Sequence, residues 1–257
     1  MSLSSIGEGE KLFVTEVVYM NRRECLKVTG RGALTVPGRL VVTTCLPVVF
    51  LAVMSFHYIP KLLHEILGVA WLLLVLLHLY QNRSWLKNLR QGSWSFGRLL
   101  GTVIDGLLIL GVLVTILSGL GVSNYLLKDV MPLAVQRSIA LHQYHVSLPY
   151  ALLILSGLHW GLHWQGWQRQ WQKCMNWSLP KMAGRLLAGT LAAFVLVAGV
   201  WGSFMNRAGD RLLMKHIFAT EATNQPGGIY VLLLAGMLGL YVLGGIVLGR
   251  SRKRRPG

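Results

Sequence analysis

One apolar stretch decides the fold, KLLHEILGVAWLLLVLLHLYQ at Lys61–Gln81. A helix needs about 20 predominantly apolar residues to cross a bilayer, and this stretch is long enough. It carries a histidine near each end, His64 and His78, and their separation of fourteen residues places both rings on one helix face, roughly 21 Å apart along the axis. Ionisable side chains inside a membrane are costly and usually functional. The stretch therefore predicts a membrane helix with two metal or cofactor ligands at two depths.

The composition is that of a membrane protein. Of the 257 residues, 53% are hydrophobic and only 13% are charged, whereas soluble domains carry about 25% charged residues. The formal net charge of +16 comes from Lys and Arg clustered between apolar runs, as the positive-inside rule produces, and no nucleic-acid recognition motif accompanies it. We therefore expect membrane lipid, and not nucleic acid, as a partner. Three dispersed cysteines indicate neither a disulfide scaffold nor a zinc site: Cys25, Cys45 and Cys174.

The hydropathy pattern predicts an all-α integral membrane protein with six transmembrane helices. Pro47 lies inside the first predicted helix and Pro60 ends it. The expected organisation is a cytoplasmic tail at 1–39, a four-helix core at 40–165, and two further helices with a basic cytoplasmic C-terminus at 166–257. The predicted spans are about Leu40–Tyr58, Lys61–Gln81, Leu99–Leu120, His142–Trp164, Leu186–Phe204 and Ile229–Leu248.

The distribution of Lys and Arg predicts that both termini are cytoplasmic. These residues concentrate in the N-terminal tail, in Gln81–Arg98, in Trp164–Arg185 and in Arg250–Arg255, which share one side of a six-span topology. Most tryptophans lie near the same side, as an interfacial aromatic belt would. The tail contains Arg22-Arg23, which resembles a twin-arginine export signal, but no clear cleavage site follows, and we interpret it as inside-facing charge. Either Met1 or Met20 fits as the start.

The fourth span repeats the histidine pattern of the second. It reads LHQYHVSLPYALLILSGLHWGLHW, and His145 and His159 are again fourteen residues apart on one face. Both spans run from outside to inside, so His64 and His145 are expected at an outer level, and His78 and His159 at an inner level. Haem iron takes imidazole nitrogen as an axial ligand, and two such ligands leave no open position. The pattern predicts two bis-histidine haems in a four-helix bundle, suited to electron transfer.

The histidines of the fourth span leave two choices open. His142 lies three residues before His145, about 60° round the helix, and His163 lies four residues after His159. Equal spacing favours His145 and His159 as ligands, and the other two are either alternative ligands or contacts to a propionate or a quinone. Two histidines outside these helices are expected at the surface, with an outer-site role as the alternative for the first: His57 and His216.

Two carboxylates lie inside predicted spans. Glu65 follows His64 and is interpreted either as an interfacial residue or as a proton carrier for quinone chemistry. Asp105 is expected either to pair with Arg98 or to hydrogen-bond an inner haem ligand. Three basic residues near the bundle ends are candidate partners for haem propionates: Arg83, Arg98 and Arg137. Several glycines on these helices permit the close approach of a helix or a flat macrocycle: Gly68, Gly101, Gly106, Gly119, Gly157 and Gly161.

Three segments together resemble a bacterial family of membrane cytochromes b. They are HEILGVAWLLLVLLHLYQNRSWL from His64, SGL at Ser118–Leu120, and the histidine-rich fourth span quoted above. The family is the flavinylation-associated cytochromes, a domain of unknown function, which is distantly similar to the cytochrome b subunits of formate dehydrogenase and nickel-iron hydrogenase. The resemblance covers about residues 40–250, and the segment from Arg207 through His216 is also similar to the end of that family.

The resemblance implies a protein with two non-covalent b-type haems in the bacterial inner membrane. It implies electron transfer between a quinol or cytoplasmic donor and an extracytoplasmic flavin or other redox partner. His64 and His78 match the first histidine pair of the family. The chain departs from the flavin-carrying members, since ATEAT at Ala219–Thr223 is not an SGAT-like acceptor. Any flavin is therefore expected on a partner and not bound covalently to this chain.

The predicted function is transmembrane electron transfer, as the membrane subunit of a redox system. One alternative is a quinone-reactive cytochrome b subunit of a membrane dehydrogenase or reductase. A second is a non-redox transporter or assembly protein. A chain with no soluble domain between its spans is expected to work with a partner subunit.

Overall fold

The computed structural model describes residues 38–89, 94–175, 181–215 and 220–253, and every regular element in these ranges is helical. The predicted all-α fold is therefore confirmed for this part of the chain. The predicted tail before residue 38, including Arg22 and Met20, and His216 lie outside the described residues. The elements are α2 (Gly38–Met54), η1 (Phe56–Tyr58), α3 (Lys61–Gln81), α4 (Ser84–Asn88), α5 (Phe96–Gly121), α6 (Leu133–Gln136), α7 (Ile139–Met175), α8 (Lys181–Met205), α9 (Ala208–Leu212), η2 (Glu221–Asn224) and α10 (Gly227–Lys253).

Four helices in the described ranges are long and apolar enough to cross a membrane. They are α3, α5, α8 from Met182 and α10 up to Arg250. The chain is thus built as a multi-pass membrane protein, and these helices contact membrane lipid. Two predicted spans are less clear by the same criteria. Helix α2 is apolar but has 17 residues, and α7 has 37 residues with a lower mean hydropathy because His, Gln and Trp interrupt it.

Several helices end at other residues than the predicted spans, and two of these differences have a clear structural cause. The first span was expected to reach Tyr58, but α2 ends at Met54. The Ser55 hydroxyl donates to the Leu51 carbonyl at 2.8 Å, and a short 3₁₀ turn leads to Ile59, which is extended as the residue before a proline prefers.

The fourth span was expected to end at Trp164, but α7 continues to Met175. No proline or strong helix stop interrupts this segment, and tryptophan rings packed at helical spacing stabilise it. Trp160, Trp164, Trp167 and Trp171 form consecutive ring contacts with centroids 5.0–6.1 Å apart.

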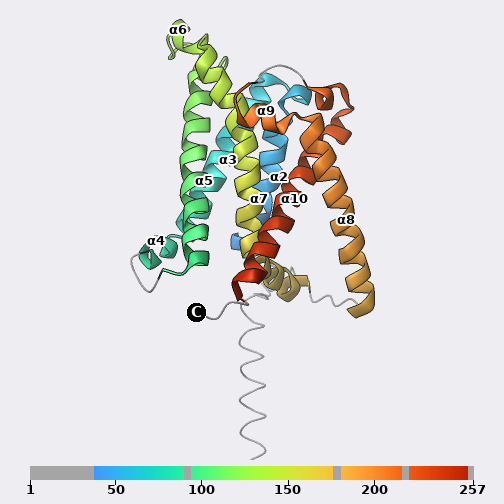
Figure 1. Ribbon diagram of the computed structural model, residues 1–257. Coiled ribbons are helices and arrows are strands. Elements are labelled where there is room, and N and C mark those ends of the chain that lie inside the picture. The colour runs from blue at the N-terminus through green and yellow to red at the C-terminus, as the bar shows by residue number, and fades with distance from the viewer. Residues whose placement is uncertain (1–37, 90–93, 176–180, 216–219, 254–257) are drawn as a thin grey trace, which may run out of the picture.

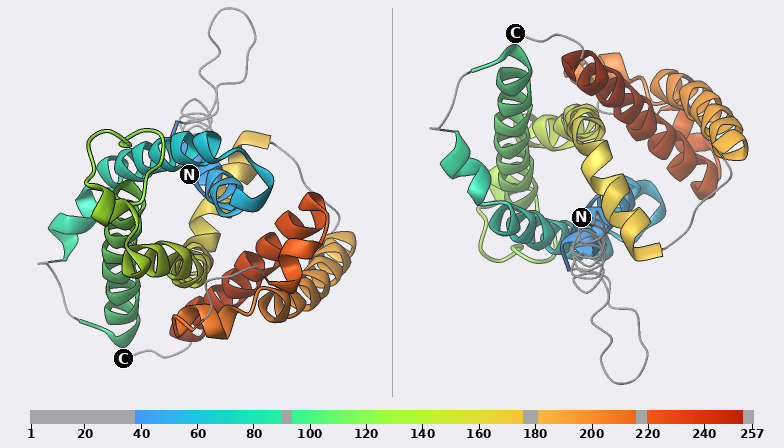
Figure 2. Two further views of the ribbon diagram at one scale, coloured as in Figure 1. Left: turned by 90° about the horizontal axis from the view of Figure 1, so that it is seen from above. Right: turned by 90° about the horizontal axis from the view of Figure 1, so that it is seen from below.

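The long helices alternate in direction, so α2 begins and α10 ends at the same end of the molecule (Figure 1). We call this the lower end, and the end that holds η1, α6 and α9 the upper end. Seen along this axis, α2, α3, α5 and α7 are arranged in a ring, with α10 and α8 outside it beside α7 (Figure 2). Helices α3 and α7 run in the same direction, as predicted for the second and fourth spans.

The ring is packed unevenly. Helix α2 packs closely against α3, and α5 packs closely against α7, which also packs against α10. In contrast, α3 makes few backbone contacts with α5 or α7 among the described residues. The α2–α3 pair is fixed by stacked rings, since Phe50 and Trp71 lie 5.0 Å apart at an interplanar angle of 21°. Trp71 is buried, with 6% of its surface exposed.

Glycines allow α10 to approach its two neighbours. A Cβ added at Gly245 of α10 would lie 2.5 Å from the carbonyl oxygen of Leu158 in α7. A Cβ at Gly199 of α8 would lie 2.5 Å from the carbonyl oxygen of Gly236 in α10. Membrane helices pack without a hydrophobic driving force, so such close backbone contact supplies much of their association. This packing holds the α8–α10 pair against the outer side of α7.

Candidate cofactor site

Two histidines face each other near the upper end, one from α3 and one from α7. The ring centroids of His64 and His145 are 6.0 Å apart, with an interplanar angle of 84°. Each ring is oriented by a backbone carbonyl. Nδ1 of His64 lies 3.0 Å from the Val53 oxygen, and Nδ1 of His145 lies 3.1 Å from the Thr115 oxygen. We call His64 and His145 the upper pair.

A second pair has nearly the same geometry near the lower end. The centroids of His78 and His159 are 6.3 Å apart, with an interplanar angle of 80°. Nδ1 of His159 lies 2.7 Å from a carboxylate oxygen of Asp105 in α5. Nδ1 of His78 is buried and has no hydrogen-bond partner among the described residues. We call His78 and His159 the lower pair.

The spacing within each pair fits one metal ion between two imidazoles. A metal–nitrogen bond of about 2.0–2.1 Å plus about 1.2 Å from the nitrogen to the ring centre predicts roughly 6.4 Å between the two centroids. The observed centroid distances are 6.0 and 6.3 Å.

Three of the four rings also have Nδ1 engaged by an oxygen acceptor. This contact fixes the tautomer with the proton on Nδ1 and leaves Nε2 to ligate, as is usual for metal-bound histidine. The residues present therefore fit two bis-imidazole sites.

Glycine makes room for one of these rings. A Cβ added at Gly119 of α5 would lie 2.6 Å from Cε1 and 2.9 Å from Nδ1 of His145. Both distances are closer than side-chain atoms tolerate, so the ring can lie against α5 only because residue 119 has no side chain. Gly119 thus permits a close approach, as predicted. It lets the His145 ring reach the carbonyl of Thr115, which lies one turn before Gly119 in α5.

Three further histidines among the described residues lie outside the two pairs. His142 is exposed, whereas His145 is half-buried and faces α3. His163 is exposed, and its ring lies 4.8 Å from that of His159. His57 lies in η1, 4.0 Å from the ring of Phe56, and burial together with the positive charge of Arg211 lowers its pKa. The geometry thus pairs the two histidines that equal spacing favours in α7.

Glu65 anchors the connection that follows α5. Its carboxylate accepts three hydrogen bonds from that segment, from Ser123 Oγ at 2.8 Å, Asn124 N at 2.9 Å and Leu126 N at 2.9 Å. Because Glu65 is next to His64, these bonds tie the top of α5 to the upper pair. The sequence does not indicate that Ser123 and two backbone amides donate to Glu65. This structural role of Glu65 was therefore not predicted.

Two interactions were predicted for Asp105, an ion pair with Arg98 or a hydrogen bond to a histidine of the inner site, and the structure shows the second. Asp105 hydrogen-bonds His159, and with His163 it forms a cluster whose ligand atoms lie within 4.8 Å of one another. Such a cluster could hold a single divalent cation. The roles of Arg83, Arg98 and Arg137 toward haem propionates stay predictions. Arg83 stacks over Tyr80, the Arg98 guanidinium donates to the Leu89 carbonyl, and Arg137 is exposed beside α6.

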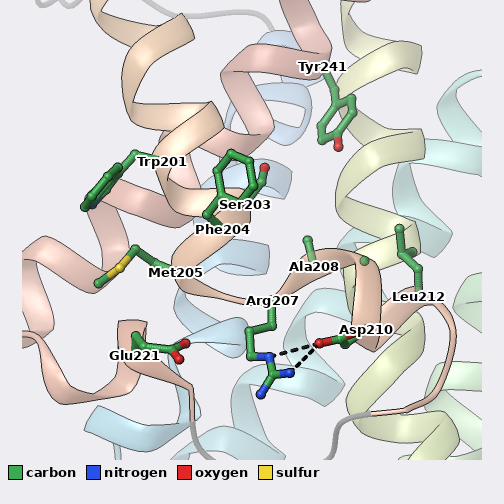
Figure 3. Close-up of a pocket in the computed structure, with 11 residues that line it drawn as sticks. Trp201, Ser203, Phe204, Met205, Arg207, Ala208, Asp210, Leu212, Glu221 and Tyr241 are labelled. Atoms are coloured by element: carbon green, nitrogen blue, oxygen red, sulfur yellow. Dashed lines mark hydrogen bonds and ion pairs between the residues drawn. The ribbon is translucent and has the colours of Figure 1, made fainter.

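A separate cleft of about 710 Å³ opens near the upper end between α8, α9, η2 and α10 (Figure 3). Arg207 and Asp210 form an ion pair at 2.8 Å within it. None of its described lining residues is a histidine, so it is distinct from the two pairs. The lining residues are Trp201, Ser203, Phe204, Met205, Arg207, Ala208, Gly209, Asp210, Leu212, Glu221 and Tyr241.

Comparison with known proteins adds no assignment to this site. No family model matches the chain, no curated protein matches it, and no solved structure matches it. The assignment of a cofactor therefore depends on the histidine pairs and on the groups that orient them.

Proposed function

We propose that this chain is a six-span membrane protein that binds two b-type haems and acts as an electron-transfer subunit. The upper pair would hold one haem and the lower pair the other. When bound, each haem supplies a one-electron carrier with both axial positions filled. The chain's own residues hold the imidazoles at the right separation and fix the tautomers of three of them. Helices α2, α3, α5 and α7 surround the four side chains.

One observation carries the proposal. Two pairs of imidazoles on two parallel helices have matching separations of 6.0 and 6.3 Å and matching interplanar angles of 84° and 80°. Histidines that merely pack against neighbours have no reason to repeat both values fourteen residues apart. The Nδ1 contacts to Val53, Thr115 and Asp105 add the outer-sphere partners that metal-bound histidines usually have.

The remaining parts of the proposal concern the setting. We propose that α2 and α7 also span the bilayer, that both termini are cytoplasmic, and that the membrane is the bacterial inner membrane. The upper pair is then the outer site. The positive-inside distribution of Lys and Arg supports this orientation. The resemblance to the flavinylation-associated cytochromes supports a redox partner subunit or an extracytoplasmic flavin protein as the electron partner.

A second candidate function follows from the cluster of Asp105, His159 and His163 at the lower end. Asp105, His159 and His163 could hold one divalent cation, which would suit a metal transporter or assembly protein. This reading leaves the geometry of the upper pair unexplained, and we rank it second. The quinone alternative lacks such support, because the carboxylates of Glu65 and Asp105 are both engaged by protein donors.

Matched histidine variants test the proposal. The purified protein is expected to show reduced-minus-oxidised spectra of b-type haem, and haem per chain is then measured in each variant. His145→Ala and His159→Ala are expected to lose one haem each. Their controls are neighbours on the same helix, His142→Ala and His163→Ala, which are expected to keep both. Equal haem content in all four variants, or zinc in place of haem in the wild type, would refute the two-haem proposal.

A further inference from the structure

The two histidine pairs differ in the groups that accept from Nδ1. In the upper pair, both Nδ1 atoms lie against neutral backbone carbonyls, of Val53 and Thr115. In the lower pair, Nδ1 of His159 lies 2.7 Å from the carboxylate of Asp105. That carboxylate is largely shielded, since only 16% of the Asp105 side chain is exposed. The ring separations and angles of the two pairs are alike. Nδ1 of His78 has no partner among the described residues, so Asp105 is the one charged acceptor that the described residues offer to the four rings.

A carboxylate acceptor changes the ligand more than a carbonyl does. Hydrogen bonds to an ionised acceptor are roughly twice as strong as neutral ones, and they strengthen in a shielded site. The carboxylate draws the Nδ1 proton toward itself and makes the imidazole more basic at Nε2. A more basic ligand stabilises ferric over ferrous iron. Hydrogen bonds of this kind are one of the ways in which proteins set the potential of an iron centre.

Two charges act against this difference. One is the Glu65 carboxylate beside the upper pair, which accepts from Ser123 and from two backbone amides and not from a histidine. The other is a positive charge near the lower pair. Arg39 lies at the lower end, where its guanidinium donates to the Gln81 carbonyl, one turn after His78. A cation near the lower pair would favour ferrous iron. However, this hydrogen bond is exposed, and exposed charges are screened by water and salt. Asp105 acts through a direct and shielded hydrogen bond to the ligand, so its effect is expected to dominate.

We infer that Asp105 is a positioning residue that holds the reduction potential of the iron at the lower pair below that of the iron at the upper pair. The inference rests on the proposed function, since it presupposes haem at both pairs. Asp105 touches neither iron. It acts through the hydrogen bond that it accepts from Nδ1 of His159.

Potentiometric titration of the purified full-length protein tests this inference. The wild type is expected to give two separate one-electron waves. In Asp105→Asn, the lower wave is expected to rise so that the ferrous-to-ferric ratio of that haem at a fixed ambient potential increases at least tenfold, a shift of about 59 mV. The higher wave should stay in place. Asp105→Glu keeps the charge and is expected to retain a separate lower wave.

The control is Asp129→Asn, which removes the same charge from an exposed position between α5 and α6. It is expected to leave both waves unchanged. Coincident waves in the wild type would overturn the inference, and this result does not depend on whether a variant folds. An unmoved lower wave in Asp105→Asn, or an equal shift of both waves, would also overturn it. Haem content separates the two proposals, because two haems per chain with coincident potentials refutes this inference alone, whereas a haem-free protein refutes the proposed function.

Discussion

The Gly119→Ala variant tests whether the His145 ring must lie against α5. The added Cβ would sit 2.6 Å from Cε1 of His145, while ordinary contact begins at 3.4 Å. The ring, or α5 itself, must therefore move by about 0.8 Å, the difference between these two distances. Metal–ligand distances tolerate only about ±0.2 Å. The shift also pulls Nδ1 away from the Thr115 carbonyl, from which it is 3.1 Å away.

The expected result is selective. Overpacking of this kind costs about 1–3 kcal/mol, which a helical membrane protein of this size should survive as a folded chain. We expect Gly119→Ala to lose the haem at the upper pair, or to bind it with an altered low-spin spectrum, and to keep the haem at the lower pair. The assay is haem per chain together with low-temperature electron paramagnetic resonance, which resolves the two ferric centres.

The control is Gly106→Ala on the same helix. Gly106 is exposed, and a Cβ added there meets nothing within 4 Å. This variant should bind two haems with wild-type spectra, because alanine is tolerated at an exposed helical glycine. If Gly119→Ala matches Gly106→Ala in haem content and spectra, the His145 ring is not held where the structure has it, and the upper site is wrongly assigned.

Two further variants probe the scaffold. Glu65→Gln removes the charge that holds the Ser123 segment, and a lost charged hydrogen bond costs about 1.5–3 kcal/mol. We expect a lower melting temperature and a changed spectrum of the upper haem only. The control is Glu221→Gln at an exposed position, which should change neither. Gly199→Leu should separate α8 from α10 and lower the melting temperature while both haems remain, because α8 lies outside the ring; Gly189→Leu, where an added Cβ meets nothing within 4 Å, should change neither. Loss of haem in Gly199→Leu would contradict the placement of α8.

The sequence predicted the elements that depend on local composition. The bounds of α3 match the predicted Lys61–Gln81 because an apolar run is bounded by Pro60 and a polar turn. The pairing of α3 with α7 follows from equal histidine spacing. In contrast, the predicted fourth span stops at Trp164, where the apolar run ends, whereas α7 continues to Met175 and the rings of Trp167 and Trp171 continue its packed face.

The contacts that orient the histidines could be predicted only in part. For Asp105, the sequence offered two partners, and only the relative rotation of α5 and α7 decides between Arg98 and His159. The Val53 and Thr115 carbonyls carry no side-chain signal, since any residue type supplies a carbonyl. The hydrogen bonds of Glu65 depend on the path of an irregular segment, which hydropathy does not describe. These groups complete the site, and they become visible only in three dimensions.

The most direct test of the central claim is the haem-to-protein ratio of the purified wild-type chain. The pyridine haemochrome assay identifies the haem type and counts it, and quantitative amino-acid analysis counts the protein. Two pairs of imidazoles at 6.0 and 6.3 Å predict two b-type haems per chain. A ratio of one, or a colourless protein that is folded in detergent, would contradict the account.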